Sequence, residues 1–398
     1  MVVLGAVLSG WLPAQTPDQQ AAERVNRHAL ASLAGLLSTT TGNVCFSPFG
    51  SHRAASMLVE AAAGETRAEL LRLTQLPEDA AMRQQLLRRL RDLMADLKSD
   101  ADLTTAQSLW AAPGVVWNPT FEKSLRDLFD APAFVLPEAD AVEQARKVNG
   151  WVREQTQGRI ADLVGPRMFE NDAHSLMLVS TLRLAATWEN RFDPSATRPA
   201  LFHPKAGQTV EVPMMQQTFA AISYAEEAGA WQCLRLPLKG GLGVVFLLPA
   251  NAEQQATIES SLTASVWAEL CAQLRNRPVV VRLPRFEFTT RLDLMPLWEA
   301  LGARTSFLPD LAQLPGLTQD QSPRFVRGVV HQATIEINEI GAQAAAATAL
   351  GTDPFGSPSE SSGPSARLFN ADHPFLWYVH QEESDLILFC GRFSGTAE

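Results

Sequence analysis

The amino-acid sequence predicts a single large α+β domain built around a mixed β-sheet. Helical stripes of apolar residues dominate the first 160 residues, whereas strand-like runs dominate the remainder. Two of these runs, residues 176–179 and 242–249, are almost wholly apolar, which is typical of strands buried on both faces. No linker or internal repeat divides the 398 residues, so we expect one domain over residues 17–398.

The helices are predicted from apolar spacing and from their boundary residues. The first covers residues 17–38, and the second begins with Ser47 as its N-cap and ends at Gly64. Thr66 and Glu69 form a capping-box pattern that opens the third helix. Helical spacing also predicts helices over residues 82–97, 121–129, 142–152 and 294–302.

The strands are predicted from apolar runs and from alternation of polar and apolar residues. Residues 331–338 alternate, so one face of that strand should be buried. The other predicted strands cover residues 103–110, 176–179, 210–216, 234–237, 242–249, 279–288, 367–369 and 375–379.

Composition excludes several classes of protein. The chain is 46% hydrophobic and 19% charged, with a net charge of −10, which disfavours binding to nucleic acid or an anionic membrane. No run is long enough to span a membrane. The four cysteines, at widely separated positions without metal-ligand spacing, are interpreted as buried free thiols, with a disulfide as the alternative.

The N-terminus has two interpretations. Residues 1–16 begin with an apolar stretch that ends near Ala14, as a secretory signal does, but they lack a basic start. They are either the remnant of a signal peptide or a disordered tail. We favour the signal, which predicts a secreted, extracellular or periplasmic protein, with the cytoplasm as the alternative.

The sequence contains no recognisable catalytic motif. It has no Gly-x-Ser-x-Gly elbow, no serine followed three residues later by lysine, no phosphate-binding loop and no HExxH pair. We therefore expect no cofactor and no metal. A hydrolase with a spatially assembled Ser-His-Asp site remains an alternative, because such triads are recognised by geometry.

Two motifs near the C-terminus resemble a known family. The alanine-rich stretch from Glu339 to Thr348 would favour a helix on propensity alone, but it lacks an apolar stripe to bury. Together with its preceding strand it resembles the hinge of a serpin reactive-centre loop. Residues 369–376 resemble the serpin signature that follows this loop. Both motifs occur in the expected order, and the resemblance extends back to about residue 25.

This resemblance implies a serpin fold, with about eight to nine helices around three β-sheets and an exposed loop over about residues 339–368. It also implies a suicide inhibitor of serine proteases, whose metastable native state inserts the cleaved loop into the central sheet. A non-inhibitory serpin that acts as a carrier, chaperone or protease substrate is the alternative. The expected partner is a chymotrypsin-like, elastase-like or subtilisin-like protease, with a cysteine protease as a further option, and we expect a monomer.

The loop sequence suits insertion as a strand. Alternate side chains of an inserting strand must be small if they are to enter a packed sheet. Proline is excluded from central strands, so insertion should stop near Pro354. The resemblance assigns these residues to the hinge: Glu339, Gly341, Ala342, Gln343, Ala344, Ala345, Ala346, Ala347 and Thr348.

Counting along the loop by the family pattern places the reactive bond between Phe355 and Gly356. Phe355 would suit a protease with a large apolar primary pocket. Leu350 is the alternative reactive residue and would suit an elastase-like protease. The loop is longer than usual in the family, and its excess, residues 356–365, follows the assigned bond.

Other positions resemble the family's conformational switches. Ser47 and His331 match the serpin shutter, and Ser180 stands where the family usually has asparagine. Trp188 matches the breach at the top of the central sheet. An ordinary structural role for His331 and Trp188 remains the alternative. Arginines 83, 88, 89 and 91 are interpreted as a solvated helix face, with a sulfated-polysaccharide site as a minor alternative.

Overall fold

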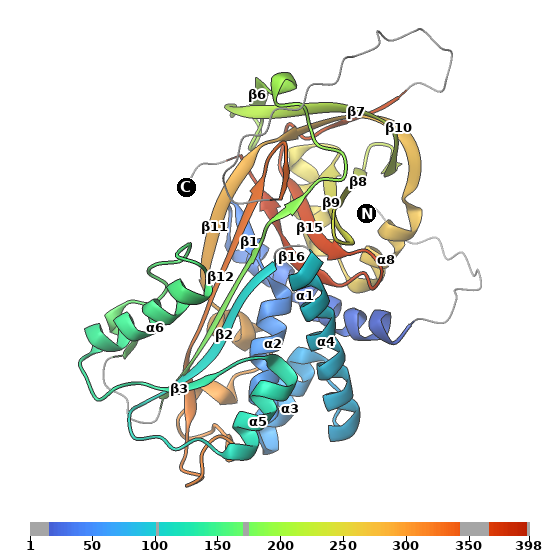
Figure 1. Ribbon diagram of the computed structural model, residues 1–398. Coiled ribbons are helices and arrows are strands. Elements are labelled where there is room, and N and C mark those ends of the chain that lie inside the picture. Colours follow the sequence, from blue (N-terminus) through green and yellow to red (C-terminus); the bar gives the residue numbers. More distant parts are fainter. Residues whose placement is uncertain (1–15, 101–102, 170–174, 343–365, 396–398) are drawn as a thin grey trace.

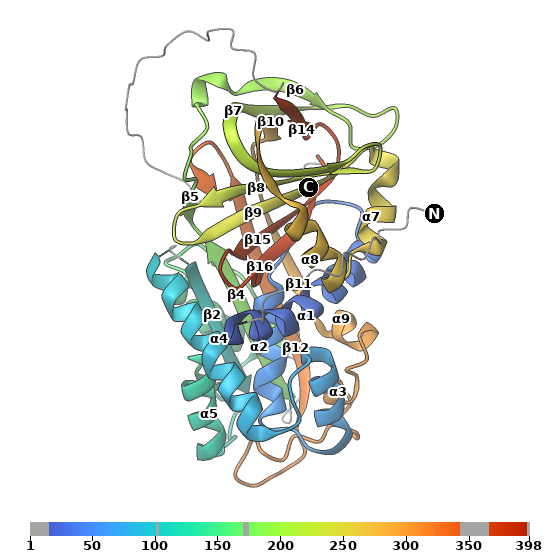
Figure 2. The ribbon, with the colours of Figure 1, turned by 90° about the vertical axis from the view of Figure 1, so that its right-hand side faces the viewer.

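A computed structural model describes residues 16–100, 103–169, 175–342 and 366–395, without the side chains of residues 98–100 (Figure 1). The described residues form an α+β domain with two mixed sheets and nine α-helices. Helices gather around the lower half of the molecule, and the larger sheet lies above them (Figure 2).

The α-helices are α1 (Pro17–Thr39), α2 (Pro48–Val59), α3 (Gly64–Thr74), α4 (Ala80–Asp100), α5 (Pro119–Phe129), α6 (Ala141–Gln155), α7 (Gln255–Ser261), α8 (Ala264–Gln273) and α9 (Met295–Ala300). The seven-stranded sheet consists of β2 (Leu103–Ala111), β3 (Ala133–Val135), β4 (Ser175–Leu184), β5 (Ala186–Thr187), β11 (Phe286–Asp293), β12 (Phe325–Ile337) and β13 (Gly341–Ala342). The nine-stranded sheet consists of β1 (Val44–Phe46), β6 (Arg198–Phe202), β7 (Val210–Glu227), β8 (Trp231–Leu238), β9 (Leu242–Pro249), β10 (Arg275–Pro284), β14 (Arg367–Asn370), β15 (Phe375–Gln381) and β16 (Ile387–Phe393).

The seven-stranded sheet has the order β3-β2-β4-β12-β13-β5, with β11 paired to the other edge of β12. At its centre β4 and β12 run parallel, from the pair Ser175 and Phe325 to the pair Arg183 and Thr334. We call this contact the seam. Every residue of β4 after Ser175 is buried, as its continuous apolar sequence predicts.

The long strand β7 explains why two sheets are found where three were expected. Its last five residues pair with β8, and its earlier part pairs with β10 and β6. One curved 18-residue strand therefore belongs to both groups of strands and joins them into a single sheet.

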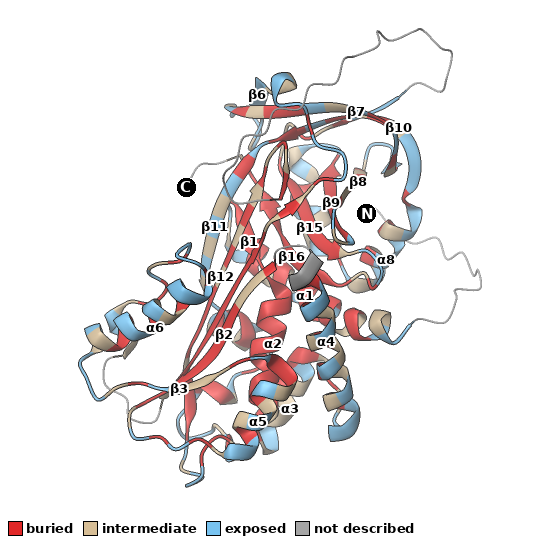
Figure 3. Ribbon diagram, in the orientation of Figure 1, coloured by how far each residue is buried: buried red, intermediate tan, exposed pale blue. Residues whose placement is uncertain are grey.

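The two faces of the seven-stranded sheet are covered unequally. Helix α2 lies behind the sheet and is buried over all twelve of its residues (Figure 3). Helix α6 covers the opposite face with a single amphipathic stripe, in which Val148 and Val152 pack over Met177 and Val179 of β4 and Val330 of β12. This third apolar cluster is smaller than the two clusters behind the sheet.

Most predicted elements are found, but two predictions of their bounds were wrong. Residues 279–288 were predicted as one strand, whereas β10 ends at Pro284 in the nine-stranded sheet and β11 begins at Phe286 in the seven-stranded sheet. Helix α2 ends at Val59, and Gly64 begins α3 instead of ending α2. The hydroxyl of Thr66 does not cap α3, because it is engaged with the Thr305 hydroxyl and the Gln313 backbone N–H.

The predicted free thiols agree with the structure: all four cysteines lie in the described part of the chain and form no disulfide. Burial raises the pKa of Cys45, Cys233, Cys271 and Cys390. A search of the described helices found none that is long and apolar enough to cross a bilayer.

Candidate functional site

The candidate site lies just above the upper end of the seam, where the short strand β13 separates β5 from β12. Ala342 of β13 lies opposite Ile337 of β12 on one side and opposite Ala186 of β5 on the other. Both pairings are antiparallel. The register of the seam, continued upward, would bring Ile337 and Ala186 directly together. β13 is therefore inserted between β12 and β5, the strand that follows β4 in the chain.

Gly341 allows this insertion because its backbone touches β5. A Cβ atom at Gly341 would lie 2.1 Å from the Ala186 carbonyl oxygen and 2.6 Å from the Thr187 Cα. Both are backbone atoms that cannot move aside as a side chain can. Only glycine fits at this position while β13 stays in the sheet.

A tight turn over residues 338–341 leads the chain from β12 into β13. The Asn338 Oδ1 accepts the backbone N–H groups of Ile340 and Gly341, which is typical of an asparagine-initiated turn. Trp188 fixes the turn from outside, because its indole Nε1 donates to the Asn338 carbonyl oxygen and its backbone N–H donates to that of Ile340. The breach role predicted for Trp188 thus has a physical basis in two hydrogen bonds to the hinge.

Glu339, in the middle of this turn, carries a nearly buried carboxylate. Its Oε1 accepts a 2.7 Å hydrogen bond from the Thr197 hydroxyl and lies 3.5 Å from the Arg285 guanidinium. The side chain of Glu339 is 9% exposed, whereas that of Arg285 is 51% exposed. The hinge is therefore attached to the top of the nine-stranded sheet through one carboxylate.

Ser180 and His331 lie directly opposite each other at the middle of the seam. Ser47 contacts both the seam and the core behind it: its backbone N–H donates to the His331 Nε2 at 3.1 Å, and its hydroxyl donates to the Leu388 carbonyl oxygen at 2.7 Å. The hydroxyl of Ser180 accepts from the Gln107 side chain at 3.1 Å. The structure therefore brings together the three shutter residues that the sequence analysis selected.

His331 is held as a neutral ring. Because its Nε2 accepts a backbone N–H, the proton must lie on Nδ1. No described residue accepts that proton, although the ring is fully buried. Burial lowers the pKa of His331 to about 3. Ser180, the residue that the sequence analysis placed where asparagine is usual in the family, is the seam partner of His331.

Sequence analysis missed several residues that complete the site. Gln107 of β2 links Ser180 to Gly50 of α2, because its Nε2 also donates to the Gly50 carbonyl oxygen. Arg53 donates to the Gln107 Oε1 and to the carbonyl oxygen of Phe129. In the sequence, Gln107 and Arg53 stand among other polar residues of β2 and α2, and no local pattern identifies their partners.

Part of the predicted site lies outside the described residues. Glu339, Gly341 and Ala342 are described, and they begin the insertion. The remaining hinge residues from Gln343 to Thr348, the alternative reactive residue Leu350 and the predicted bond between Phe355 and Gly356 belong to residues 343–365, which are not described. These assignments stay predictions.

Comparison with protein-family models matches residues 24–395 to the family described as serpin (serine protease inhibitor). An uncharacterised serpin-like protein of Thermococcus kodakarensis is 32% identical over 363 residues, which cover 89% of this chain and 81% of that protein. Human antithrombin-III is 30% identical over 293 residues, covering 73% of this chain but 62% of its own length, less than two thirds.

Solved structures give the same result. The crystal structure of Serpin48, described as a highly specific serpin of the insect Tenebrio molitor, superposes with a TM-score of 0.84 at 25% identity and covers 96% of this chain and 99% of that one. Human thyroxine-binding globulin superposes with a TM-score of 0.83 at 20% identity, over 96% of this chain and all of that one. These superpositions confirm the fold that the resemblance predicted.

Proposed function

Because this chain belongs to the serpin family of serine protease inhibitors, we propose that it traps serine proteases covalently and carries them away by inserting its cleaved loop into the seam. Family membership confirms the prediction of a protease inhibitor over that of a hydrolase. The covalent trapping mechanism is our proposal, and one feature of the structure supports it most directly.

That feature is the register of β13. Its antiparallel pairing with β12 can continue downward only if each further pair of residues enters between β4 and β12. Positions 344, 346 and 348 would then lie opposite Ile335, Ala333 and His331 of β12. These three residues of β12 are buried, and Ile337 above them is buried as well. The residues that must enter the core are thus Ala342, Ala344, Ala346 and Thr348, which are all small.

The same count connects the hinge to the shutter. Continuing the register from Ala186 places position 348 opposite Ser180, and continuing it from Ile337 places the same position opposite His331. The two residues that face each other across the closed seam would therefore be separated by Thr348. Insertion replaces a parallel pair by two antiparallel pairs, which are more stable per residue, and it adds a new set of backbone hydrogen bonds. This gives the direction of the change.

Insertion also limits where the bait bond can lie. Pro354 cannot donate to a central ladder, so a fully inserted strand ends close to it. A bond between Phe355 and Gly356 allows the full length to insert, and it favours a chymotrypsin-like target. Cleavage after Leu350 would suit an elastase-like protease but would shorten the inserted strand.

The test is incubation of the protein with chymotrypsin, elastase and subtilisin, followed by denaturing gels and mass spectrometry. We expect an SDS-stable complex with at least one protease, and a released C-terminal fragment that begins at Gly356. Cleavage without a complex for every protease would favour the non-inhibitory alternative. A complex whose fragment begins elsewhere would contradict only the assigned bond.

We also propose that the protein is secreted and monomeric, with residues 1–16 as the remnant of the signal. The apolar start of the sequence supports secretion. The cysteines neither favour nor oppose it, since none of the four forms a disulfide. Fractionation of producing cells with N-terminal sequencing tests the location, and sedimentation velocity tests the monomer. A cytoplasmic chain that retains Met1 would contradict secretion.

A further inference from the structure

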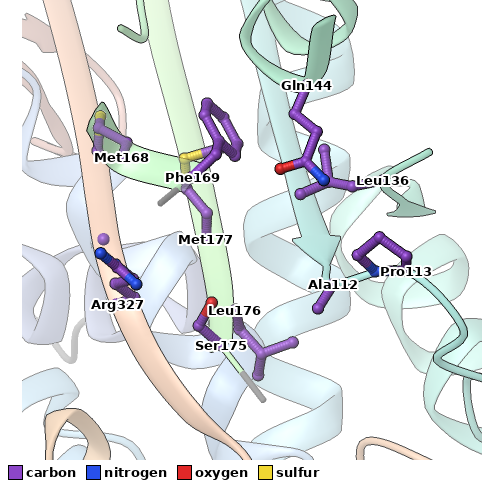
Figure 4. A pocket seen from close by; sticks show the side chains of 11 residues that line it. Ala112, Pro113, Leu136, Gln144, Met168, Phe169, Ser175, Leu176, Met177 and Arg327 are labelled. Carbon is purple, nitrogen blue, oxygen red and sulfur yellow. The ribbon is translucent and has the colours of Figure 1, made fainter. Parts of the chain in front are cut away.

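A cavity of about 200 Å³ lies at the lower end of the seam, on the face that α6 covers (Figure 4). Its walls combine apolar and polar groups, with Met168 and Phe169 of η1 (Pro166–Phe169) above Met177 of β4. Three polar side chains line it, and two of them, Gln144 of α6 and Arg327 of β12, reach it from opposite sides of β4, while the third is Ser175 of β4 itself. It is separate from the hinge and from the shutter.

Gln144 presents a hydrogen-bond acceptor to the cavity. The side chain is 8% exposed, and its Nε2 donates to the Pro137 carbonyl oxygen at 3.1 Å. That bond fixes which end of the amide is nitrogen, so the oxygen is the end that points toward Met177 and Phe169 (Figure 4). A buried amide oxygen of this kind favours a ligand that donates a hydrogen bond.

Arg327 supplies a cation on the other side. It occupies a β-bulge, because the register of β12 against β4 shifts between Val326 and Gly328. The half-buried side chain of Arg327 forms part of the cavity wall. No carboxylate among the described residues pairs with Arg327. A guanidinium without a described carboxylate partner, at the wall of a cavity, is a site for a carboxylate.

The cavity joins both strands of the seam. Ser175, Leu176 and Met177 come from β4, and Arg327 and Gly328 come from β12. Leu176 pairs with Val326, and Met177 pairs with Gly328, so these walls lie on directly hydrogen-bonded strands. A strand inserted between them would move the walls apart by about 4.8 Å, the spacing of neighbouring strands. The cavity in its present form therefore belongs only to the closed seam.

We propose that this cavity is a binding site for a small aromatic carboxylate that carries a hydroxyl group, and that the bound ligand opposes loop insertion. The carboxylate would pair with Arg327, the hydroxyl would donate to the Gln144 oxygen, and the ring would pack against Met168, Met177 and Phe169. A ligand that binds only the closed seam stabilises it by linkage. Its effect on inhibition rests on the proposed function, whereas its binding does not.

The volume sets the class of ligand. A cavity of about 150 Å³ holds one benzene ring, so about 200 Å³ leaves room for one ring with two short substituents. Ligands of this size bind weakly, and we expect a dissociation constant on the order of 0.1–1 mM.

The probe is 4-hydroxyphenylacetate, measured by calorimetry and by saturation-transfer NMR against the full chain and against the loop-cleaved chain. We expect binding to the intact protein and at least about tenfold weaker binding to the cleaved protein. The neutral amide of the probe, which cannot form an ion pair, should bind about tenfold more weakly. With the probe bound, more inhibitor molecules should be consumed for each protease trapped.

The variant Arg327→Met removes the cation, and Arg291→Met is its matched control, since Arg291 is exposed on β11 away from the cavity. Only Arg327→Met should lose binding. No binding of the probe to the intact protein at about 10 mM would overturn the site. Equal affinity of the intact and cleaved proteins would overturn the coupling of the site to insertion. The comparison of acid with amide tests the cation even if Arg327→Met fails to fold. If the probe binds but no protease is ever trapped, the proposed function fails and the site stands. If a protease is trapped but the probe does not bind, the proposed site fails and the proposed function stands.

Discussion

The hinge above the seam and the middle of the seam are held in different ways. At the top, β13 already separates β12 from β5, and the hinge is attached through hydrogen bonds of Asn338, Glu339 and Trp188. In the middle, Ser180 and His331 meet directly and are enclosed by buried hydrogen bonds from Ser47 and Gln107. The top is thus prepared to open, whereas the middle must first lose buried contacts.

This difference would explain how the proposed metastable sheet stays closed. At the top, Arg285 is half exposed, so water can replace its ion pair with Glu339 as the sheet opens. Opening the middle leaves buried polar groups of Ser47 and Gln107 without partners until a new strand arrives, and each such group costs about 1–3 kcal/mol. We therefore expect the middle of the seam to set the barrier to insertion. The following predictions test that division.

The largest effect is expected from Ala342→Arg at the top. Ala342 is fully buried between Ile337 and Ala186, so an arginine there would have to place its charge in the core or leave the sheet. We expect the variant to be cleaved as a substrate, with at least about a tenfold rise in the inhibitor consumed for each protease trapped. Gel densitometry of complex against cleaved inhibitor measures this ratio.

Ala221→Arg is the matched control, because Ala221 is exposed on β7. It should inhibit as the parent does. Undiminished trapping by Ala342→Arg would mean that the register of β13 does not continue into the seam.

Acid should weaken the middle of the seam by several kcal/mol. Burial lowers the pKa of His331 to about 3, below the ordinary value of 6.5. Between these two values the unfolded state binds a proton at His331 and the folded state does not. The free energy of unfolding is therefore highest above pH 6.5 and decreases as the pH falls toward 3. The loss is about 1.4 kcal/mol per pH unit for each such histidine. Urea unfolding between pH 4 and 7 measures the slope.

Two more buried histidines contribute to the same slope. Burial lowers the pKa of His28 to about 4 and that of His52 to about 3, in the packed region of α1 and α2. Replacing His331 by glutamine should reduce this slope, the change in the free energy of unfolding per pH unit, by the contribution of one histidine. A double variant that also carries His28→Gln should reduce it by the contribution of two. An unchanged slope in His331→Gln would show that the ring is not held neutral.

A smaller loss is expected from Ser47→Ala. The hydroxyl donates to the Leu388 carbonyl oxygen and accepts the backbone N–H of Gly50, so the variant leaves two buried backbone groups unpaired. We expect a loss of about 2 kcal/mol in the free energy of unfolding and faster spontaneous insertion of the loop. Ser260→Ala, on the exposed end of α7, should change neither quantity by more than about 0.5 kcal/mol. Normal insertion kinetics in Ser47→Ala would place the barrier elsewhere.

The sequence predicted the elements of this molecule better than the contacts between them. Strands such as β4 and β9 were evident because both their faces are buried, and α5 and α6 were evident from a single apolar stripe. The predicted start of α3 at Thr66 was wrong because Thr66 bonds to Thr305 and Gln313, tertiary partners that no local pattern reveals.

For the site, resemblance supplied Ser47, Ser180, His331 and Trp188, and the structure brings the first three together across the seam. It could not supply Gln107 or Arg285, since a buried amide network and a rim ion pair depend on register between distant strands. The inserted strand β13 was also beyond local reasoning, because its two residues are held in place by two other strands, β12 and β5, and by a turn, not by their own propensity.

The smallest effect is expected from Arg285→Ala at the rim of the hinge. Its guanidinium lies 3.5 Å from the Glu339 carboxylate and is half exposed, so the ion pair contributes less than about 1 kcal/mol to stability. Glu339 keeps the hydrogen bond from Thr197, and the hinge therefore stays attached. Urea unfolding should thus change little, and trapping should be unaffected. Thr197→Val, which removes the shorter contact to the more buried group, should have the larger effect on both measurements. If Arg285→Ala lowered stability or trapping more than Thr197→Val, the ion pair and not the hydrogen bond would hold the hinge. The rim would then be a main barrier to opening, and the proposed difference between the top and the middle would be wrong.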